Sequence, residues 1–314
     1  MSKITIIGTG NVGATIAYTL SREAIASEVV LIDVNKEKMI GEVMDIEQGT
    51  CFRQPITIKA GDYEDAKGSD IVIITSGIGR KPGQTRLELT QTNVNILKNI
   101  TPEVVRYAPE AVYVIVSNPV DILTYVFTKI SGLPERQVLG SGTALDTARL
   151  RFILGQKLSI AQKNVHAYVL GEHGDTSFIP WSDVYVSGLS LNEYLKEAKR
   201  LGIPTEPINK EEILTYVQKS GGQIIANKGA TFYAVSSAVT HICHNLVSPT
   251  DSISTVSTML HGEYGLEDVA LSALTVIGPH GVKGKMPMRM NKTDFANLEK
   301  SADALKQVIA QIEI

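Results

Sequence analysis

The sequence predicts an α/β protein in which a doubly wound parallel sheet is followed by an α+β half. Short apolar runs rich in Val and Ile alternate with amphipathic helical stretches up to about residue 140. These runs have no polar face, as expected of strands covered by helices on both sides. Beyond residue 140 the alternation stops, and helices precede two β-branched runs. We therefore expect two closely packed domains, residues 1–140 and 141–314.

The apolar and helical patterns also predict the individual elements. The expected parallel strands are Ile4–Ile7, Val29–Val34, Ile56–Lys59, Ile71–Thr75, Val112–Ser117 and Gln137–Gly140. The expected helices between them cover residues 11–24, 36–49, 86–107 and 119–131. Later helices are expected at Asp146–Leu158, at Lys210–Leu246 with a bend at Gly221-Gly222, and from Thr293 to the end. The two β-branched runs, Ile253–Met259 and Val269–Ile277, predict an antiparallel pair around a turn at Gly262–Gly265.

Composition excludes several classes of protein. The 314 residues carry 30 Lys and Arg against 33 Asp and Glu, so no basic surplus indicates binding to nucleic acid or to an anionic membrane. Apolar runs such as Ile71–Ile74 are far shorter than a membrane span. Cys51 and Cys243 lie far apart and form no CxxC pair, which argues against a disulfide framework or a zinc site. We expect a cytoplasmic protein without a bound metal.

A glycine motif follows the first predicted strand. Gly8-Thr-Gly10-Asn11-Val12-Gly13 opens a helix, and an acidic residue, Asp33, follows 20 residues beyond its last glycine. This is the fingerprint of a Rossmann dinucleotide site, in which backbone N–H groups at the helix N-terminus hold the pyrophosphate. Asp33 would accept hydrogen bonds from the adenosine ribose and repel a 2′-phosphate, which favours NAD over NADP. The alternative, a glycine turn beside an incidental acidic residue, leaves the strand, spacing and helix unexplained.

A second informative segment is Leu170-Gly-Glu-His173-Gly-Asp-Thr176. A histidine between glycines and acidic residues is not in the setting of a packed core histidine. Asp146, 27 residues upstream, would fix the tautomer of His173 and favour the imidazolium if the two side chains meet. The alternative for Asp146 is a carboxylate stabilised by the N-terminus of its own helix. One helical turn could serve both purposes.

Taken in order, the motifs resemble those of the lactate/malate dehydrogenase family, and most closely its bacterial lactate-specific members. They are GTGNVG, LIDV, GIGRKPGQTR, SNPVD, GSGTALDTARLR, LGEHGDT and KGATFYA, and the resemblance covers essentially the whole chain. It implies an NAD-binding Rossmann domain at residues 1–140 and a catalytic, substrate-binding domain at 141–314. It also implies a homotetramer or homodimer that works in glycolysis or fermentation.

The resemblance assigns roles to individual residues. His173 matches the acid/base that exchanges a proton with the substrate C2 oxygen, and Asp146 matches its carboxylate partner. Arg149 matches the clamp for the C1 carboxylate, since a planar guanidinium binds a carboxylate with two hydrogen bonds. Arg86 matches the residue that polarises the substrate carbonyl. The implied reaction is hydride transfer between the nicotinamide C4 and the substrate C2.

Two further residues complete the set that the resemblance implies. Asn118, in Ser-Asn-Pro, matches the residue that hydrogen-bonds the same substrate oxygen. Ser141 matches the position that orients the nicotinamide carboxamide. A non-catalytic NAD-binding protein would not need His173, Asp146, Arg86 and Arg149 together. An NAD-dependent glycosidase, the other alternative, requires metal-binding cysteine and histidine that this chain does not place in a catalytic context.

The substrate is less clearly indicated, because the motifs point in two directions. Arg80 stands where lactate-specific members carry glutamine and malate enzymes carry arginine, and Gln84 departs from the acidic residue common in lactate enzymes. A second carboxylate would need such a cation. Glu172, Trp181 and the pocket-narrowing Thr231 follow the lactate pattern instead. We favour pyruvate and L-lactate, with oxaloacetate and malate, or dual activity, as the alternative.

The resemblance also suggests allosteric regulation. Bacterial members that respond to fructose 1,6-bisphosphate carry an arginine two residues past the clamp and a histidine seven before the catalytic one. Here these positions are Arg151 and His166. Pairs of these cations meeting across a two-fold axis would repel one another until a bisphosphate neutralised them. The alternative is an arginine on an exposed helix face and a histidine that simply ends a strand.

Overall fold

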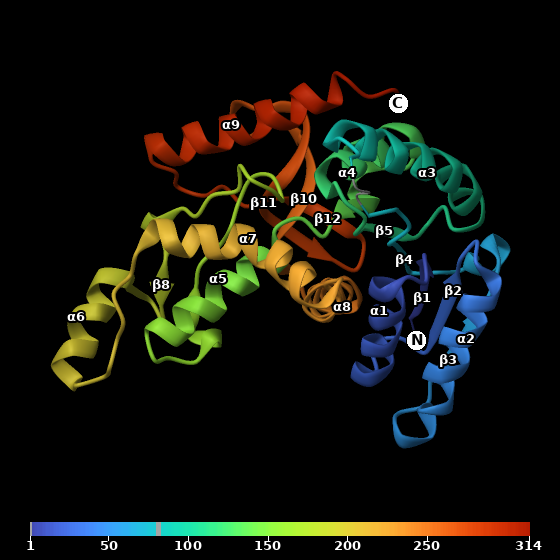
Figure 1. Cartoon of the computed structure of the whole chain (residues 1–314), viewed down its shortest axis with the longest axis horizontal. Coiled ribbons are helices and arrows are strands. Elements are labelled where there is room, and N and C mark those ends of the chain that lie inside the picture. Colours follow the sequence, from blue (N-terminus) through green and yellow to red (C-terminus); the bar gives the residue numbers. More distant parts are fainter. Residues whose placement is uncertain (1, 80–82) are drawn as a thin grey trace.

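The computed structural model describes residues 2–79 and 83–314. In this part of the chain a nine-stranded sheet has the order β12-β11-β10-β6-β5-β4-β1-β2-β3 (Figure 1). Six neighbouring strands are parallel: β1 Lys3–Ile7, β2 Glu28–Ile32, β3 Thr57–Ala60, β4 Ile71–Ile74, β5 Val112–Ile115 and β6 Val138–Gly140. The remaining three are antiparallel: β10 Ser252–His261, β11 Glu267–Gly278 and β12 Gly281–Lys285. This arrangement confirms the predicted fold class and the antiparallel pair.

Helices cover both faces of this sheet (Figure 1). Apolar residues of α1, α2 and α8 form the core on one face, and those of α3, α4 and α9 form it on the other. The helices are α1 Asn11–Glu23, α2 Lys36–Gln48, α3 Arg86–Tyr107, α4 Val120–Ser131, α5 Ala144–Lys157, α6 Leu191–Leu201, α7 Lys210–Lys228, α8 Tyr233–Val247 and α9 Lys292–Ile309. Single 3-10 turns lie at Thr50–Phe52, Tyr63–Ala66, Glu135–Gln137, Gln162–Asn164, Trp181–Asp183 and Glu263–Gly265.

The strand β4 shows why the apolar runs have no polar face. Ile71 and Ile73 belong to the core beneath α1 and α2, whereas Val72 and Ile74 belong to the core beneath α3 and α4. Successive side chains of a strand point to opposite faces, so both faces must be apolar when helices cover both. All four residues are buried. The unbroken apolar runs in the sequence therefore indicate strands that are covered by helices on both faces.

A second, smaller sheet packs against α5. It consists of β7 Val165–His166, β8 Tyr185–Val186 and β9 Leu189–Ser190, paired antiparallel. Together with α5, α6 and α7 it encloses a third core. This sheet was not predicted, because its strands of two residues are too short to leave a periodic pattern. The helix α6 and the strand β12 were missed as well. None of the described helices is both long and apolar enough to cross a membrane.

Two predicted features of the chain are wrong. The sequence indicated one helix with a bend at Gly221-Gly222, but α7 continues through both glycines. The break comes later, where α7 ends at Lys228, Gly229 has a left-handed φ of +85°, and α8 begins at Tyr233. The second predicted strand also ends earlier than expected: β2 stops at Ile32, and Val34 is 97% exposed.

Candidate active site

The glycine motif forms a tight turn between β1 and α1. Gly8 has a φ of +102°, and a Cβ at Gly13 would lie 1.9 Å from the carbonyl oxygen of Gly8, so neither position accepts a side chain. Gly10 differs, because a Cβ there would meet nothing within 4 Å. Gly10 is the N-cap of α1 and provides no side-chain cap, which leaves the first N–H groups of the helix free for a phosphate. Asn11 and Val12 form the first turn of α1.

Asp33 lies directly after β2 and is fixed by backbone hydrogen bonds. Its Oδ2 accepts the Thr9 N–H at 2.5 Å, and its Oδ1 accepts the Asn35 N–H at 2.8 Å. Partial burial raises the pKa of this carboxyl, but these N–H groups outweigh that effect and hold the pKa below its usual value. Asp33 therefore stays ionised. It lines a cavity of about 560 Å³ together with Ile32 of β2, Tyr63 after β3 and Ile96 of α3, which fits an adenosine group.

The predicted pair of His173 and Asp146 is formed. Nδ1 of His173 lies 2.5 Å from Oδ2 of Asp146, and Nη1 of Arg149 donates to Oδ1 of the same carboxylate at 2.6 Å. The Asp146 side chain is only 5% exposed, and that of His173 is 27% exposed. Asp146 lies in the first turn of α5, so it has the favourable position at a helix N-terminus as well as the contact with His173.

The pKa values of this pair move in opposite directions. Burial lowers the pKa of His173, but the charge and hydrogen bond of Asp146 outweigh it, and the net effect is a raised pKa. Burial raises the pKa of Asp146, but His173 and Arg149 reverse this and hold that pKa below its ordinary value. The geometry thus favours an imidazolium beside a carboxylate. Such a pair can hold a proton on the histidine for transfer to a substrate.

Most of the predicted substrate residues line one cavity of about 290 Å³. Asn118, Asp146, Arg149, His173 and Thr231 all belong to its lining. Val12 of the glycine motif lines the same cavity, so the cofactor and substrate regions adjoin. A small neighbouring cavity is lined by Ser141 together with Asn118 and His173. The structure therefore brings together segments that are separated by more than a hundred residues.

One predicted residue, Arg86, is not part of this cavity lining, and another, Arg80, cannot be placed from the described part of the chain. Arg86, the first residue of α3, lies outside it and forms an exposed ion pair with Asp175, with Nη1 and Oδ2 2.8 Å apart. Asp175 follows His173 by two residues, so the guanidinium is held beside the segment that carries His173 rather than at the cavity lining. Arg80, the residue that raised the malate alternative, lies outside the described residues.

Several residues of the site were missed from the sequence. Gly221 and Gly222 of α7 line the cavity; a Cβ at Gly221 would lie 3.4 Å from Nη2 of Arg149, whereas one at Gly222 would meet nothing within 4 Å. Gln218, one turn earlier, donates to the carbonyl oxygen of Ser177 at 3.0 Å. Ser301 of α9 accepts the N–H of Glu172 at 2.6 Å. The glycine pair was the one visible signal, since glycines inside a helical pattern indicate a close approach.

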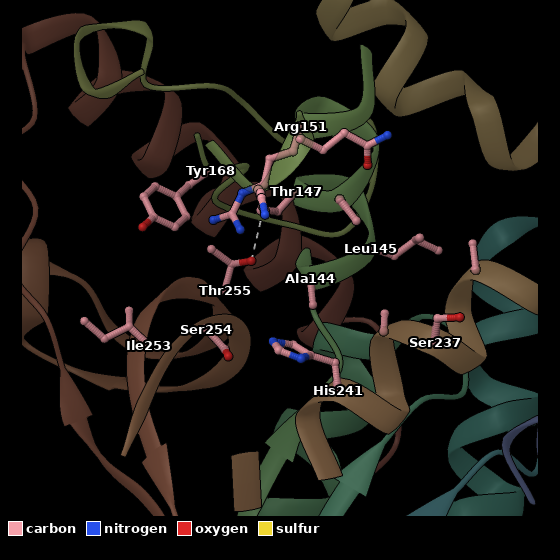
Figure 2. Close-up of a pocket in the computed structure, with 15 residues that line it drawn as sticks. Ala144, Leu145, Thr147, Arg151, Tyr168, Ser237, His241, Ile253, Ser254 and Thr255 are labelled. Atoms are coloured by element: carbon pink, nitrogen blue, oxygen red, sulfur yellow. Dashed lines mark hydrogen bonds between the residues drawn. The ribbon is translucent and has the colours of Figure 1, made fainter. Parts of the chain in front are cut away.

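Arg151 and His166 lie near each other but differ in their surroundings. Nε of Arg151 donates to the carbonyl oxygen of Ala167, the residue after His166, at 3.0 Å. Arg151 stacks on Tyr168, with 5.2 Å from its Cζ to the ring centroid, and lines a cavity of about 500 Å³ that includes His241 (Figure 2). His166 ends β7 and is exposed, outside that lining. Burial lowers the pKa of Arg151.

Comparison with known proteins covers almost the whole chain. Residues 2–140 match the model of the lactate/malate dehydrogenase NAD-binding domain, and residues 143–313 match that of the α/β C-terminal domain of the same family. The chain belongs to the lactate/malate dehydrogenase family. The predicted cofactor, NAD, is thereby confirmed, and the protein is an NAD-dependent oxidoreductase. Among residues 2–79 and 83–314, no three His, Cys, Asp or Glu side chains are grouped to hold a metal ion.

Individual members of the family are similar over their full length. An L-lactate dehydrogenase of Acetivibrio thermocellus is 44% identical over 314 residues, covering 100% of this chain and 98% of the relative. L-lactate dehydrogenase 1 of Clostridium acetobutylicum is 43% identical over 311 residues, covering 99% and 98%. A crystal structure of the minor L-lactate dehydrogenase from Enterococcus mundtii superposes with a TM-score of 0.94 at 35% identity, covering 100% and 99%.

Proposed function

We propose that this lactate/malate dehydrogenase family member is an L-lactate dehydrogenase, which reduces pyruvate to L-lactate reversibly. The observation that carries the proposal is the meeting of His173, Asp146 and Arg149 at one cavity beside the dinucleotide turn. A protonated imidazole and a guanidinium there match the carbonyl and the carboxylate of a 2-oxo acid. The relatives described above carry the same activity in their names.

Each residue of the cavity has a distinct role in the proposed reduction of pyruvate. Arg149, whose Nη1 is held by Asp146, would bind the C1 carboxylate of pyruvate with its remaining N–H groups. His173 would donate its proton to the C2 oxygen, while Asp146 stabilises the imidazolium before transfer. Asn118 would donate a hydrogen bond to the same oxygen. Bound NADH supplies the hydride that C2 accepts. Ser141, beside both Asn118 and His173, would orient the nicotinamide amide.

Arg86 would act on the substrate only after it releases its present partner, Asp175. Its guanidinium is 79% exposed and paired with Asp175, so it is available near the site without contacting the cavity. In the proposed mechanism it leaves Asp175 and polarises the substrate carbonyl. An exposed ion pair is weak, so this exchange costs little.

The cavity also supports a preference for pyruvate over oxaloacetate. Thr231 lines the same cavity as Arg149, where its side chain would reduce the space for a larger C3 group. The malate alternative depends on Arg80, and the relatives named as L-lactate dehydrogenases do not favour it.

The deciding experiment is a spectrophotometric assay of NADH oxidation with pyruvate and, separately, with oxaloacetate. We expect kcat/KM for pyruvate to exceed that for oxaloacetate by at least tenfold. A larger value for oxaloacetate would assign the protein to the malate enzymes. No oxidation with either substrate would overturn the proposal of a 2-hydroxy acid dehydrogenase.

We also propose that fructose 1,6-bisphosphate activates the enzyme at a site containing Arg151 and His166. The hydrogen bond from Arg151 to the carbonyl oxygen of Ala167 joins the arginine to the residue next to His166 in the chain, which supports the pairing. The ligand would be bound between subunits and favour the active arrangement. Activation should appear at sub-saturating pyruvate, where a shift toward the active arrangement has the largest effect on the rate. Unchanged activity on titration at slightly acidic pH would refute this regulation.

The remaining proposals concern assembly and setting. Exposed apolar side chains on α2 and around α8, namely Ile40, Met44, Tyr233 and Ile253, support association with further copies of this chain as a homotetramer or homodimer. Reduction of pyruvate regenerates NAD, which suits a cytoplasmic enzyme of glycolysis and fermentation. Sedimentation of the purified protein would establish the number of subunits.

A further inference from the structure

The mechanism above leaves one buried carboxylate near the catalytic histidine unused. Asp121 lies in the first turn of α4, just after the cis Asn118-Pro119 bond, and is 2% exposed. Its Oδ2 accepts the backbone N–H of His173 at 2.7 Å. Its Oδ1 is buried and makes no well-formed hydrogen bond among the described residues, although the Ser257 hydroxyl lies close enough to influence the carboxyl. A charge in such a position is costly, so its presence requires an explanation.

The N-terminus of α4 does not explain Asp121 by itself. A carboxylate that caps a helix accepts hydrogen bonds from the first N–H groups of that helix. The hydrogen bond of Asp121 goes instead to His173, which lies 52 residues further along the chain. The helix dipole still favours the ionised carboxyl, but the contact itself is directed at the catalytic segment.

The carboxyl of Asp121 changes its ionisation within the pH range in which enzyme activity can be measured. Burial raises the pKa of its carboxyl to about 6, and the nearby negative charge of Glu172 adds to this effect. The Ser257 hydroxyl, the His173 N–H and the positive charge of His173 oppose it. Asp121 is therefore ionised above about pH 6 and neutral below. Its negative charge raises the pKa of His173, in the same direction as Asp146 and against Arg149.

We propose that Asp121 is a positioning residue for His173, which fixes the backbone of the catalytic segment and adds a second negative charge that keeps the imidazole protonated. Asp146 and Arg149 face His173 from α5, Asp121 faces it from α4, and Glu172 precedes it in the chain. The inference rests on the proposed function of His173 as proton donor. It explains why a buried carboxylate accepts the backbone N–H of this residue.

The test compares variants that remove the negative charge of Asp121 with a variant that removes only a hydrogen bond to the segment carrying His173. In Asp121→Asn the amide oxygen can still accept the His173 N–H, but the charge is gone. Asp121→Ser is a second variant that also removes the charge and retains a hydroxyl oxygen. Ser301→Ala is the matched control, because it removes a hydrogen bond to Glu172 in the same segment without removing a charge. Asp146→Asn, which removes the contacting carboxylate, serves as the positive control.

The readout is the modification of His173 by diethyl pyrocarbonate in the protein without cofactor, followed by peptide mass spectrometry. This reagent attacks the neutral imidazole, so the midpoint of rate against pH reports the pKa of His173. We expect the midpoint to fall in both Asp121 variants by a few tenths to ~1 unit, less than the ~1–3 units that a contacting charge produces. Ser301→Ala should leave it unchanged, and Asp146→Asn should lower it most.

Steady-state kinetics give an independent check. In Asp121→Asn, kcat/KM for pyruvate should approach the parent value below about pH 6, where the parent carboxyl is itself neutral. It should fall increasingly below the parent at higher pH. An unshifted midpoint in both folded Asp121 variants, or a loss of activity equal at every pH, would overturn the proposal. Failure of His173 as proton donor would leave the midpoint shift intact, so the two hypotheses fail separately.

Discussion

The cofactor turn and the catalytic cavity are assembled in opposite ways. The cofactor turn lies within one β1-α1-β2 unit, and its glycines act through space and backbone N–H groups. The candidate catalytic cavity takes Asn118 from the loop between β5 and α4, Asp146 from α5 and His173 from the segment after β7. Its chemistry depends on buried charges that only the folded chain brings together. Local sequence therefore determines the first region, and tertiary structure determines the second.

This difference has energetic consequences. Removing one partner of a buried ion pair lowers the stability of the fold strongly, because the other partner is left as an uncompensated buried charge. Asp146, with its side chain 5% exposed, is held by both His173 and Arg149. Asp33, by contrast, is held by backbone N–H groups that remain when its side chain is changed. We expect changes in the catalytic cavity to affect turnover strongly, and changes at the cofactor turn to affect affinity and selectivity.

The largest effect should follow the substitution His173→Asn. The asparagine side chain cannot deliver a proton to the C2 oxygen, so kcat should fall by ~10²–10⁴-fold. NADH affinity, measured by fluorescence titration, should stay near that of the parent because Asp33 and the glycine turn are untouched. Near-normal turnover in this variant would show that the proton comes from elsewhere. A comparable loss of NADH affinity would break the separation of the two regions.

The next largest effect is expected for Arg149→Lys. An ammonium keeps the positive charge but loses the planar pair of N–H donors, and hydrogen bonds to charged groups contribute ~1.5–3 kcal/mol. The value of kcat/KM for pyruvate should therefore fall by about 10–100-fold. The pH profile should change little, because the charge beside His173 and Asp146 is retained. A variant with parental kcat/KM would mean that Arg149 does not bind the substrate carboxylate.

The fold could be predicted largely from the sequence, because its signals are local. The Val and Ile runs record strands buried on both faces, and strand β4 shows this in its two sets of contacts. The glycine pair in α7 illustrates the limit. Gly221 and Gly222 were interpreted as a bend, but Gly221 lies beside the guanidinium of Arg149 in a continuous helix. Periodicity cannot distinguish a glycine at which a helix bends from one within a continuous helix that lines a cavity.

The candidate site shows the same limit. Asp146 could be paired with His173 in advance because its motif is distinctive, and the 2.5 Å contact agrees with that prediction. Asp121 and Ser301 could not, although both hydrogen-bond the catalytic segment. Asp121 lies 52 residues from His173, and Ser301 lies 129 residues from Glu172. Only the folded arrangement of the chain brings each of these pairs into contact. The ion pair of Arg86 with Asp175 was missed for the same reason.

A smaller effect is expected at the cofactor turn from Asp33→Ser. The change removes the ribose acceptor and the charge that repels a 2′-phosphate, so the preference for NADH over NADPH should fall by about tenfold or more. The kcat at saturating NADH should remain close to the parent value, since the catalytic cavity is unchanged. The ratio of kcat/KM values for the two cofactors provides the measurement. An unchanged ratio would exclude Asp33 as the selective residue.

The smallest effect is expected from Asp175→Asn, which releases Arg86 from its partner near the catalytic cavity. If Arg86 must leave Asp175 to reach the substrate, kcat/KM for pyruvate should rise, but by less than about fivefold because both side chains are exposed. The gain should shrink at high ionic strength, where exposed charges are screened. The same substitution in an Arg86→Gln background separates this pair from a general effect of charge on the anionic substrate. An equal gain in that background would show that Asp175 acts on pyruvate directly and that its ion pair with Arg86 has no role in turnover.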